Sequence, residues 1–324
     1  MGISGYGGRE LLRLVLGHPT FRLAYAAGES SAGQRLGQLF PSLAGRSEAD
    51  LTIAKFDPAD TAGLDVLFAS LPTGKSREVL AKVEPNVRCI DLGGDHRFLN
   101  GWTYGLTELP DHRDAIRVCK RLANPGCYPA AALLALMPLI SRGLIDSEGI
   151  VIDAKSGITG TGRGGASSFG YVESSEDVFA YGLQQHPHAS EIETVIGKMA
   201  KKRASVAFTP HVVPMKRGLL ATCYARPLKH LRLEDLHDAA RQMYRQEPFV
   251  RVIEDKSRGP RTSAVTASNL AHVSYAINDR TGLVVALGVV DNLGKGAAGQ
   301  AVQNANLMAG LAEDAGLTGA PLLT

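Results

Sequence analysis

Short apolar runs separated by glycine-rich and proline-rich turns dominate the first third of the chain. Residues 64–70 and 87–92 are mainly apolar, which is typical of buried parallel strands. Residues 21–27 alternate in polarity and indicate a further strand, whereas 10–16 and 76–83 have apolar positions at helical spacing. Because strands and helices alternate here, the sequence predicts βαβ units and a parallel sheet.

The rest of the chain follows a different pattern. An Ala- and Leu-rich run at 130–140 predicts a helix, as does the amphipathic segment 233–244. Strands are predicted at 150–154, 205–209, 219–225 and 283–290. Hairpins and helices join these strands without a regular βαβ order, which predicts a second domain of the α+β type with a mixed or antiparallel sheet.

The predicted fold class is therefore α/β, with a Rossmann-type parallel-sheet domain and a second α+β catalytic domain with a mixed sheet. We place the first domain at 1–126, with its first strand apparently missing and completed by the C-terminal helix 293–324, and the second at 127–292. A length of 324 residues is compatible with two such domains.

The composition of the chain excludes few classes of function, but it does bear on the type of protein and on its compartment. With 44% hydrophobic and 21% charged residues the chain is an ordinary globular protein, and a net charge of +3 gives no reason to expect nucleic-acid binding. No apolar run reaches the roughly eighteen residues of a membrane span, and the N-terminus does not resemble a signal peptide. The four cysteines form no C-x-x-C pair, so we expect reduced thiols in the cytoplasm.

The most informative stretch is Asn124-Pro125-Gly126-Cys127-Tyr128-Pro129. It places one cysteine on a Pro/Gly turn at the start of the predicted helix 130–140, where Pro129 suits the first helical turn. Unpaired backbone N–H groups and the helix dipole favour a thiolate at such a position. We therefore interpret Cys127 as a nucleophile; the alternative is a buried structural cysteine.

A glycine turn opens the chain. Gly2, Gly5 and Gly8 precede a helical pattern, as in turns that bring a backbone close to a pyrophosphate, although an ordinary glycine-rich turn has the same spacing. The loop that follows the strand 21–27 would meet the adenosine ribose. There Glu29 favours NAD, whereas Ser30, Ser31 and Arg35 favour the 2′-phosphate of NADP, so the residues leave both open.

Three further segments carry chemistry. His186, His188 and Glu191 lie within six residues at a predicted helix start, which suits a general acid/base oriented by a carboxylate; a surface histidine pair or a metal site are alternatives. The loop 155–165 combines glycines, hydroxyls and Arg163, and the connection 211–218 is basic. Both segments suit the binding of an anionic substrate, and both also have the composition of ordinary solvated loops.

Taken together, these segments resemble the N-acetyl-γ-glutamyl-phosphate reductase family, within the aspartate-semialdehyde dehydrogenase-like superfamily. The resemblance covers nearly the whole chain, and its motifs occur in order. The cysteine turn and the last segment are the most specific. The motifs are Gly2-x-x-Gly5-x-x-Gly8, Asp91 to Arg97, Asn124 to Pro129, Lys155 to Gly157, His186-x-His188-x-x-Glu191, His211 to Gly218, and Asp291 to Gly296.

The resemblance implies the NADPH-dependent conversion of N-acetylglutamyl phosphate to N-acetylglutamate semialdehyde in arginine biosynthesis, by a homodimer or homotetramer. It implies that Cys127 forms a thioester, that His188 shuttles a proton, and that Glu191 orients His188. The implied substrate-binding residues are Arg97, Asn124, Ser156, Arg163, His186, His211 and Arg217. The implied cofactor-binding residues are Gly2, Ser4, Gly5, Tyr6, Gly8, Ser30, Ser31, Pro72, Gly157, Asn292, Lys295 and Gly296.

The chain departs from the family pattern in two places. The strand that normally precedes the glycine turn is missing, so we expect a start upstream of Met1 or a truncated chain. Glu29 stands where many relatives carry arginine or serine, which leaves the preference for NADP over NAD open. The nearest alternative function is a related reductase of lysine biosynthesis acting on a carrier-protein-linked aminoadipyl phosphate. A cysteine hydrolase and a non-catalytic dinucleotide-binding regulator are more distant alternatives.

Overall fold

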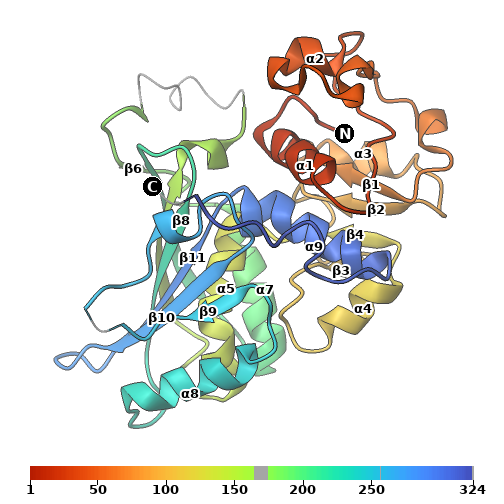
Figure 1. Cartoon of the computed structure of the whole chain (residues 1–324). Helices are drawn as coiled ribbons and strands as arrows, with labels where there is room; N and C mark the ends of the chain where they lie inside the picture. The colour runs from red at the N-terminus through yellow and green to blue at the C-terminus, as the bar shows by residue number, and fades with distance from the viewer. Residues whose placement is uncertain (164–173, 256, 323–324) are drawn as a thin grey trace. The chain divides into compact units, whose positions relative to one another are not determined.

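The computed structural model describes residues 1–163, 174–255 and 257–322 (Figure 1). These residues form two compact units. Unit 1 consists of Met1–Pro125 with Ala297–Thr318, and unit 2 consists of Gly126–Gly296 with the residues from Gly319 onward. One unit contains a parallel sheet and the other a mixed sheet, so the predicted α/β fold class is confirmed.

Unit 1 is built on a four-stranded sheet in the order β1-β2-β4-β3, in which all neighbours are parallel. In this unit α9 packs against both α1 and α4, and it also contacts β2. The elements are α1 (Tyr6–Leu16), α2 (Leu36–Leu39), β1 (Val66–Ala69), α3 (Ser76–Leu80), β2 (Arg88–Asp91), β3 (Thr103–Tyr104), α4 (His112–Val118), β4 (Arg121–Ala123) and α9 (Gly299–Met308).

The strand predicted at 21–27 is not formed in the structure. Only Ala27 makes a strand-like contact, a parallel bridge to Ala54. Polarity alternation records which side chains are buried, but a strand also requires a neighbouring backbone to pair with. The last helix is also shorter than predicted, because α9 ends at Met308 and is preceded by a π-helical turn over Gly294–Ala298.

Unit 2 is built on a seven-stranded mixed sheet in the order β6-β7-β5-β8-β11-β10-β9. Its strands are β5 (Ile150–Gly157), β6 (Phe179–Ala180), β7 (Val206–Val213), β8 (Leu219–Ala225), β9 (Val250–Val252), β10 (Ala271–Ile277) and β11 (Val284–Val290). The sequence had not indicated β9 or β10. β7 runs four residues further than predicted, so His211 lies on a strand and not in the predicted connection.

Three helices cover one face of this sheet: α5 (Cys127–Ser141), α7 (Pro187–Ala200) and α8 (Leu233–Tyr244) (Figure 1). α5 is the central one, because it contacts α7, α8 and three strands. Gly288 of β11 allows the backbone of α5 to approach the sheet closely, because a Cβ built there would lie 2.8 Å from the carbonyl carbon of Ala131. The sheet therefore fixes the start of α5, which carries Cys127.

The opposite face of the mixed sheet exposes apolar side chains. Val151 is 43% exposed and Tyr224 is 37% exposed, whereas their strand neighbours Ile150, Ile152 and Cys223 are buried against the helices. Val151 pairs with Tyr224, and Tyr224 pairs with Val285, so the three side chains form a row across β5, β8 and β11. This alternation is what one solvent-exposed sheet face produces.

Candidate active site

Cys127 is the first residue of α5. Its predecessor Gly126 is the N-cap, with φ −71° and ψ 158°, and it provides no side-chain cap. The first turn contains no acidic residue, so the dipole of a fifteen-residue helix acts directly on the Cys127 thiol. Burial raises the pKa of the Cys89 thiol to about 11 and also raises those of Cys119 and Cys223. The helix start thus distinguishes Cys127 from the other three cysteines.

The His188 ring lies directly against the backbone of Gly126. A Cβ built at Gly126 would approach three ring atoms of His188, with Cδ2 at 2.7 Å, Cε1 at 2.8 Å and Nε2 closer still. Any larger residue at position 126 would therefore displace the imidazole. The structure brings the predicted base within one residue of the predicted nucleophile, and it does so through a contact that only glycine permits.

Glu191 contacts the same turn from α7. Its Oε1 accepts a hydrogen bond from the backbone N–H of Gly126 at 2.9 Å, and the side chain is buried. A carboxylate that accepts from a buried N–H makes a charge-assisted bond, which is stronger than a neutral one. Through this bond Glu191 fixes Gly126, the residue that precedes Cys127. This contact is separate from the predicted orientation of His188 by Glu191.

His186 caps α7. Its Nδ1 accepts from the backbone N–H of His188 at 3.2 Å, and Pro187 occupies the first helical position. Burial lowers the pKa of His186 to about 4, so its ring is neutral at physiological pH. One ring nitrogen of this predicted substrate ligand is thus committed to the helix cap that positions His188.

Aromatic rings enclose the histidine pair. Tyr128 and Phe208 lie edge-on to His186, with ring centroids 5.9 and 5.2 Å away. The Tyr128 hydroxyl donates to the carbonyl of His211 at 3.1 Å, and burial raises the Tyr128 pKa. The ring of His211, predicted to bind substrate, has its Nδ1 3.1 Å from a carboxylate oxygen of Asp153.

Arg217 is anchored by a buried carboxylate. Its Nε lies 2.9 Å from Oδ2 of Asp291, which has no exposed surface, while the Arg217 side chain is 20% exposed. Asp291 also accepts from the N–H groups of Ala267, Leu293 and Gly294, at 2.5, 2.8 and 3.2 Å. Sequence analysis gave Asp291 no role. The sequence feature that could have identified Asp291 is its position, since it is a charged residue directly after the apolar strand.

Asn292 joins two loops. Its Oδ1 accepts from the N–H of Gly218 at 2.8 Å, and its Nδ2 donates to Oγ1 of Thr159 at 2.9 Å. Gly157 packs against the same connection, since a Cβ there would lie 2.8 Å from the carbonyl oxygen of Met215. Asn292 and Gly157, both predicted cofactor ligands, thus hold the end of β5 beside residues 215–218. Ser156 is buried, and its hydroxyl donates to the carbonyl of Gly157 at 3.2 Å.

Gly296 lies against the cysteine itself. A Cβ built at Gly296 would be 2.9 Å from Cβ of Cys127, so this position also tolerates only glycine. Lys295 is completely buried, with its Nζ 5.7 Å from the centre of the Phe249 ring. Arg163 is exposed at the end of a described segment. The last two residues of the predicted glycine-rich loop, 164 and 165, lie outside the described residues.

In unit 1 the glycine turn has the features of a dinucleotide-binding turn. Gly2 has φ +78°, which makes the tight turn possible, and Gly5 N–H donates to the Gly2 carbonyl at 3.1 Å. A Cβ on Gly8 would lie 2.8 Å from the Gly2 carbonyl carbon, so Gly8 allows α1 to pack closely. Gly5 directly precedes Tyr6, the first residue of α1. A Cβ built at Gly5 would make only an ordinary contact, 3.5 Å from the Gly2 carbonyl oxygen. These three roles fit a pyrophosphate at a helix N-terminus.

The neighbouring candidates in unit 1 vary in exposure. The Ser4 carbonyl accepts from Arg9 Nε at 3.1 Å, which steadies the turn. Ser31 is buried against Gly28, whereas Ser30 and Pro72 are exposed. Glu29 lies 3.7 Å from Lys55 in an exposed pair, so an opposite charge accompanies this acid at the predicted ribose loop.

Two predicted substrate ligands support the cysteine turn from within unit 1. Arg97 Nε donates to the Asn124 carbonyl at 3.0 Å. The Asn124 side chain is fully buried, donating to the Ala297 carbonyl at 3.0 Å and accepting from Asn304 Nδ2 at 3.1 Å. Both atoms of the Asn124 amide are therefore used inside the protein. These bonds hold the Asn124 side chain in place, and its predicted contact with substrate stays a prediction.

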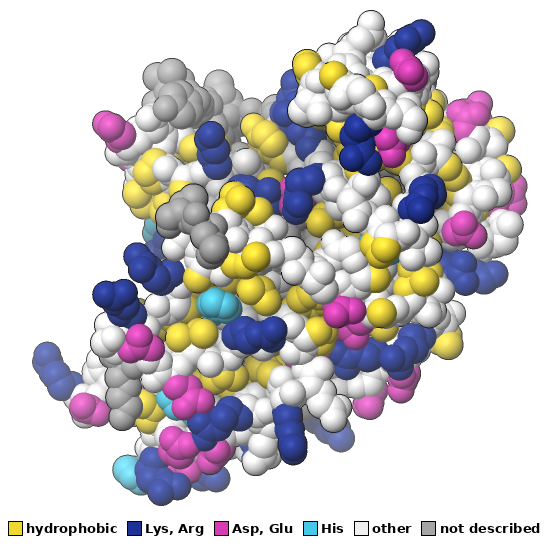
Figure 2. Space-filling model, viewed as in Figure 1, with side chains coloured by type: hydrophobic (Ala, Val, Ile, Leu, Met, Phe, Trp, Pro, Cys, Tyr) yellow, Lys and Arg dark blue, Asp and Glu magenta, His cyan; other side chains and the backbone are white. Residues whose placement is uncertain are grey.

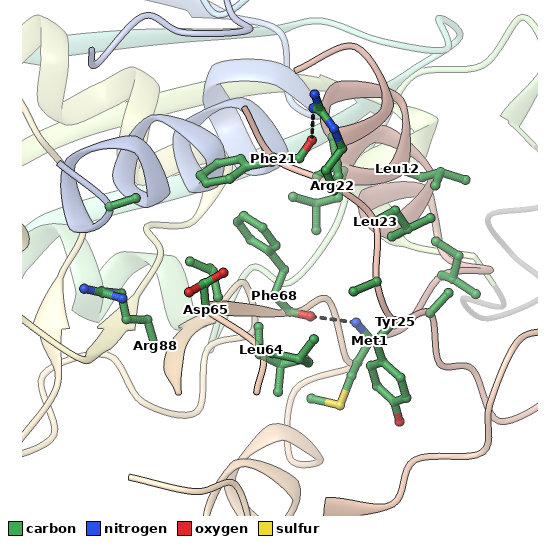
Figure 3. Close-up of a pocket in the computed structure, with 18 of the residues that line it drawn as sticks. Met1, Leu12, Phe21, Arg22, Leu23, Tyr25, Leu64, Asp65, Phe68 and Arg88 are labelled. Carbon is green, nitrogen blue, oxygen red and sulfur yellow. Dashed lines mark hydrogen bonds between the residues drawn. The ribbon is translucent and has the colours of Figure 1, made fainter. Parts of the chain in front are cut away.

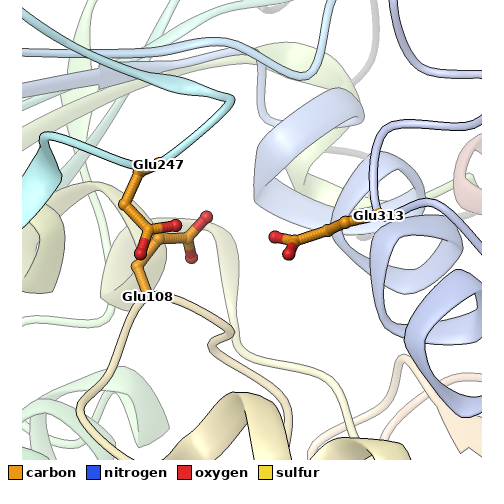
Figure 4. Close-up of side chains that lie close together, drawn as sticks. All are labelled: Glu108, Glu247 and Glu313. Carbon is orange, nitrogen blue, oxygen red and sulfur yellow. The ribbon is translucent and has the colours of Figure 1, made fainter.

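Charged groups elsewhere have partners of their own. Gln303 Nε2 donates to Oε1 of Glu108 at 3.1 Å and to Oε1 of Glu313 at 2.7 Å, and Arg113 Nε donates to Glu313 Oε2 at 2.8 Å (the two carboxylates are labelled in Figure 4).

Figure 2 shows Lys and Arg side chains interspersed with Asp and Glu on the face it displays. None of the helices in the described part of the chain has both the length and the apolar character that a membrane crossing requires.

Comparison with known proteins matches both parts of the chain. The family described as "Semialdehyde dehydrogenase, NAD binding domain" matches residues 1–118, and "Semialdehyde dehydrogenase, dimerisation domain" matches residues 127–292. Among solved structures, aspartate semialdehyde dehydrogenase with NADP from Candida albicans superposes with a TM-score of 0.75 at 14% identity, covering 95% of this chain and 97% of that one. Aspartate semialdehyde dehydrogenase II from Vibrio cholerae, complexed with ASA, gives 0.73 at 15% identity, covering 95% and 96%.

Curated relatives are much closer in sequence. The N-acetyl-gamma-glutamyl-phosphate reductase of Bradyrhizobium sp. (strain ORS 278) is 55% identical over 323 residues, covering 99% of this chain and 97% of that protein. That of Methylobacterium sp. (strain 4-46) is 53% identical, with the same coverage. A probable chloroplastic enzyme of that name from Arabidopsis thaliana is 37% identical and covers 99% and 84%. The chain therefore belongs to the N-acetyl-γ-glutamyl-phosphate reductase family.

Proposed function

We propose that this chain catalyses the NADPH-dependent reductive dephosphorylation of N-acetylglutamyl phosphate to N-acetylglutamate semialdehyde, a step of arginine biosynthesis. Relatives of 37 to 55% identity that span the chain carry the name of this reaction. The observation that carries the proposal is local. Cys127 begins α5, the His188 ring packs on Gly126, and Glu191 accepts from the N–H of Gly126.

Cys127 acts as the nucleophile. Its thiolate attacks the acyl carbon of the substrate, the C–O bond to phosphate breaks, and inorganic phosphate leaves with that bond's electron pair. The product is a thioester on Cys127. The N-terminal dipole of α5 supports both the thiolate and the oxyanion that develops during attack. Gly126 N–H already donates to Glu191, so oxyanion stabilisation is assigned to the first turn of α5 that follows it.

His188 is the general acid/base. When NADPH is bound it supplies the hydride that reduces the thioester carbon. His188 donates a proton to the oxygen that becomes negative, and takes it back as the C–S bond breaks and the semialdehyde leaves. His186 holds His188 through the helix cap and is itself neutral, because burial lowers its pKa to about 4.

Arg217 is the leading candidate for binding the substrate's negative groups. The buried carboxylate of Asp291 fixes its guanidinium, while a fifth of the side chain remains exposed. A guanidinium fixed in this way matches a carboxylate or a phosphate bidentately. Asn292 and Gly157 then act by holding the 215–218 connection in place.

NADP binding is assigned to the glycine turn of unit 1. The fit rests on the conformation of Gly2, the tight packing at Gly8, and the start of α1 directly after Gly5. The preference for NADP over NAD rests on Ser30 and Ser31, with the Glu29 charge partly compensated by Lys55.

The same reasoning extends to assembly. We infer a homodimer or homotetramer that buries the row Val151, Tyr224 and Val285 of the mixed sheet, in which Val151 and Tyr224 are exposed and Val285 is half-buried. A flat face of apolar side chains is suited to an isologous contact between two copies. The cytoplasm is the compartment we assign, because all four cysteines are free thiols.

The reaction is tested in the reverse direction. N-acetylglutamate semialdehyde, inorganic phosphate and NADP are mixed with the enzyme, and reduced nicotinamide is followed by its absorbance. We expect phosphate-dependent turnover that is lost in Cys127→Ala and retained in Cys119→Ala, the matched control at a partly buried cysteine elsewhere. Turnover in Cys127→Ala would refute the nucleophile. Activity only with carrier-linked aminoadipate semialdehyde would favour the lysine-pathway reductase.

A further inference from the structure

The loop predicted to meet the adenosine ribose starts beside the glycine turn. The N–H groups of Gly2 and Ile3 both donate to the Ala27 carbonyl, at 2.9 and 3.2 Å. Ala27 is the last residue before this loop, which spans residues 28–35 and is called the ribose loop below. In dinucleotide-binding folds the glycine turn meets the pyrophosphate, and the loop after the next strand meets the ribose.

A second segment brings a cation to the ribose loop. Ala54 forms a parallel bridge to Ala27, and the Gly28 N–H donates to the Ala54 carbonyl at 3.0 Å. The next residue along the chain is Lys55, whose Nζ lies 3.7 Å from Oε1 of Glu29. Lys55 therefore reaches the ribose loop from outside it. Sequence analysis gave this lysine no role, because the bridge that brings it there is a tertiary contact.

The ion pair between Lys55 and Glu29 is one that a ligand can break. The Lys55 side chain is 75% exposed and the Glu29 side chain is 84% exposed. An ion pair between two exposed side chains contributes little, because both charges remain hydrated. A phosphate monoester carries roughly two negative charges at neutral pH. It therefore attracts the Lys55 ammonium group more strongly than the single charge of Glu29 does.

Two other residues of the ribose loop are compatible with a bound ribose phosphate. Arg35 already has a partner outside the loop, because its Nη1 donates to Oδ1 of Asp50 at 3.2 Å. Ser31 is buried, and among the described residues its hydroxyl has no hydrogen-bond partner. This hydroxyl lies against Gly28, where a Cβ would come within 2.5 Å of it. A buried hydroxyl without a protein partner is satisfied by water or by a ligand, which fits the polar groups of a sugar.

The large groove of unit 1 is less suited to a phosphate. Its volume is about 520 Å³, and it is lined mainly by apolar side chains, among which Leu12, Leu23 and Phe68 are labelled in Figure 3. A phosphate dianion placed there would lose much of its hydration, whereas at the exposed Lys55 it would keep contact with water. Charge and hydration both favour the ribose loop.

We propose that Lys55 determines the preference for NADP over NAD, because its ammonium group leaves Glu29 and binds the 2′-phosphate of the adenosine ribose. Lys55 thereby completes the cofactor site of the proposed function, on which this role rests. Glu29 acts against NADP in two ways, since it competes for Lys55 and repels the phosphate. With NAD, which has no 2′-phosphate, Lys55 stays paired with Glu29.

The test measures the dissociation constants of NADPH and NADH, which differ only in the 2′-phosphate, from the fluorescence of the reduced nicotinamide without substrate. We expect Lys55→Ala to raise the Kd of NADPH by about tenfold to 100-fold, the effect of losing a bond to a charged group. The Kd of NADH should change by no more than about threefold, because no phosphate contact is lost. Lys55→Arg should keep most of the NADPH affinity. The matched control is Lys82→Ala, which removes the same charge from an exposed pair with Glu78.

Glu29→Gln separates direct binding of the phosphate from simple compensation of the Glu29 charge. Without the competing carboxylate, NADPH should bind more tightly than in the wild type. In this background Lys55→Ala should still weaken NADPH by about tenfold or more, whereas a lysine that only neutralised Glu29 would no longer matter. An equal loss for NADPH and NADH, or no loss in the Glu29→Gln background, would overturn the proposal.

The binding measurement does not depend on turnover. A chain that loses NADPH selectively in Lys55→Ala but shows no phosphate-dependent reductase activity would refute the proposed function and leave the role of Lys55 standing. An active reductase whose NADPH affinity is unchanged in Lys55→Ala would support the proposed function and overturn the role of Lys55. Failure of the wild-type chain to bind NADPH would also overturn it.

Discussion

Replacing Gly126 by alanine tests the geometry beside Cys127. The backbone at Gly126 has φ −71° and ψ 158°, which alanine adopts readily, so the substitution introduces no backbone strain. The nearest obstacle is the His188 ring, whose Cδ2 and Cε1 would lie 2.7 and 2.8 Å from the new Cβ. Carbon atoms prefer separations of about 3.5 to 4.0 Å, so the ring must move by about 1 Å.

That displacement sets the expected loss of activity. A misplacement of about 1 Å at a catalytic group costs about 100-fold in rate, which corresponds to about 2.7 kcal/mol of barrier. Overpacking costs about 1 to 3 kcal/mol of unfolding free energy, partly offset by about 0.4 to 1 kcal/mol because alanine restricts the unfolded chain. We therefore expect a folded enzyme with kcat reduced about 100-fold.

The assay is steady-state reduction of NADP in the reverse reaction, with urea unfolding as the stability measurement. Gly259→Ala is the matched control, because a Cβ there meets its nearest neighbour, Leu287, at an ordinary 3.9 Å. In a His188→Ala background the conflict disappears, so Gly126→Ala should add almost nothing to the loss. Wild-type kcat in Gly126→Ala, or full additivity with His188→Ala, would refute this account of the site.

Three further predictions concern the surroundings of this turn and the sheet. Glu191→Ala removes the acceptor of the buried Gly126 N–H and should lower the unfolding free energy by about 1 to 3 kcal/mol, whereas Glu191→Gln keeps an acceptor and should lose less; equal losses in urea titrations would contradict the assigned bond. The pKa of His186 falls from 6.5 to about 4 on burial, so between those values the unfolded chain binds a proton that the folded chain does not. Stability should therefore decrease as pH falls from 6.5 to 4. His186→Asn should reduce the slope of stability against pH. An unchanged slope would show that other groups cause the pH dependence. Tyr224→Asp places a charge in the exposed sheet row and should shift the oligomer to monomer in analytical ultracentrifugation, while the exposed Leu228→Asp should not; an unchanged mass in Tyr224→Asp would place the interface elsewhere.

Local sequence was sufficient for most elements that lie near Cys127. The predicted helix after Cys127 and the helix 233–244 are both present, because apolar spacing and the Pro/Gly turn act within a few residues. The same local signals identified His188 and Glu191 as a pair at a helix start. The family resemblance followed from motifs in order, and the comparisons confirm it.

Signals that depend on a distant backbone were misjudged. Residues 21–27 alternate like a strand, but the structure leaves them without a ladder because pairing needs a neighbour as well as a pattern. The family resemblance implies that Asn124 binds substrate, and this stays a prediction. Sequence alone did not show that the two atoms of its amide bond to Asn304 and to the Ala297 carbonyl, which lie about 180 residues further along the chain.

The sequence by itself determined which family the chain belongs to, and it predicted a nucleophile at a helix start and a glycine turn suited to a dinucleotide. Those properties depend on residues adjacent in the chain. Only the tertiary structure decided that Glu191 holds the Gly126 N–H, that Asp291 fixes Arg217, and that glycine at 126 and 296 makes room for His188 and Cys127. These contacts join residues far apart in sequence at van der Waals or hydrogen-bond distance, and no local pattern encodes such a distance.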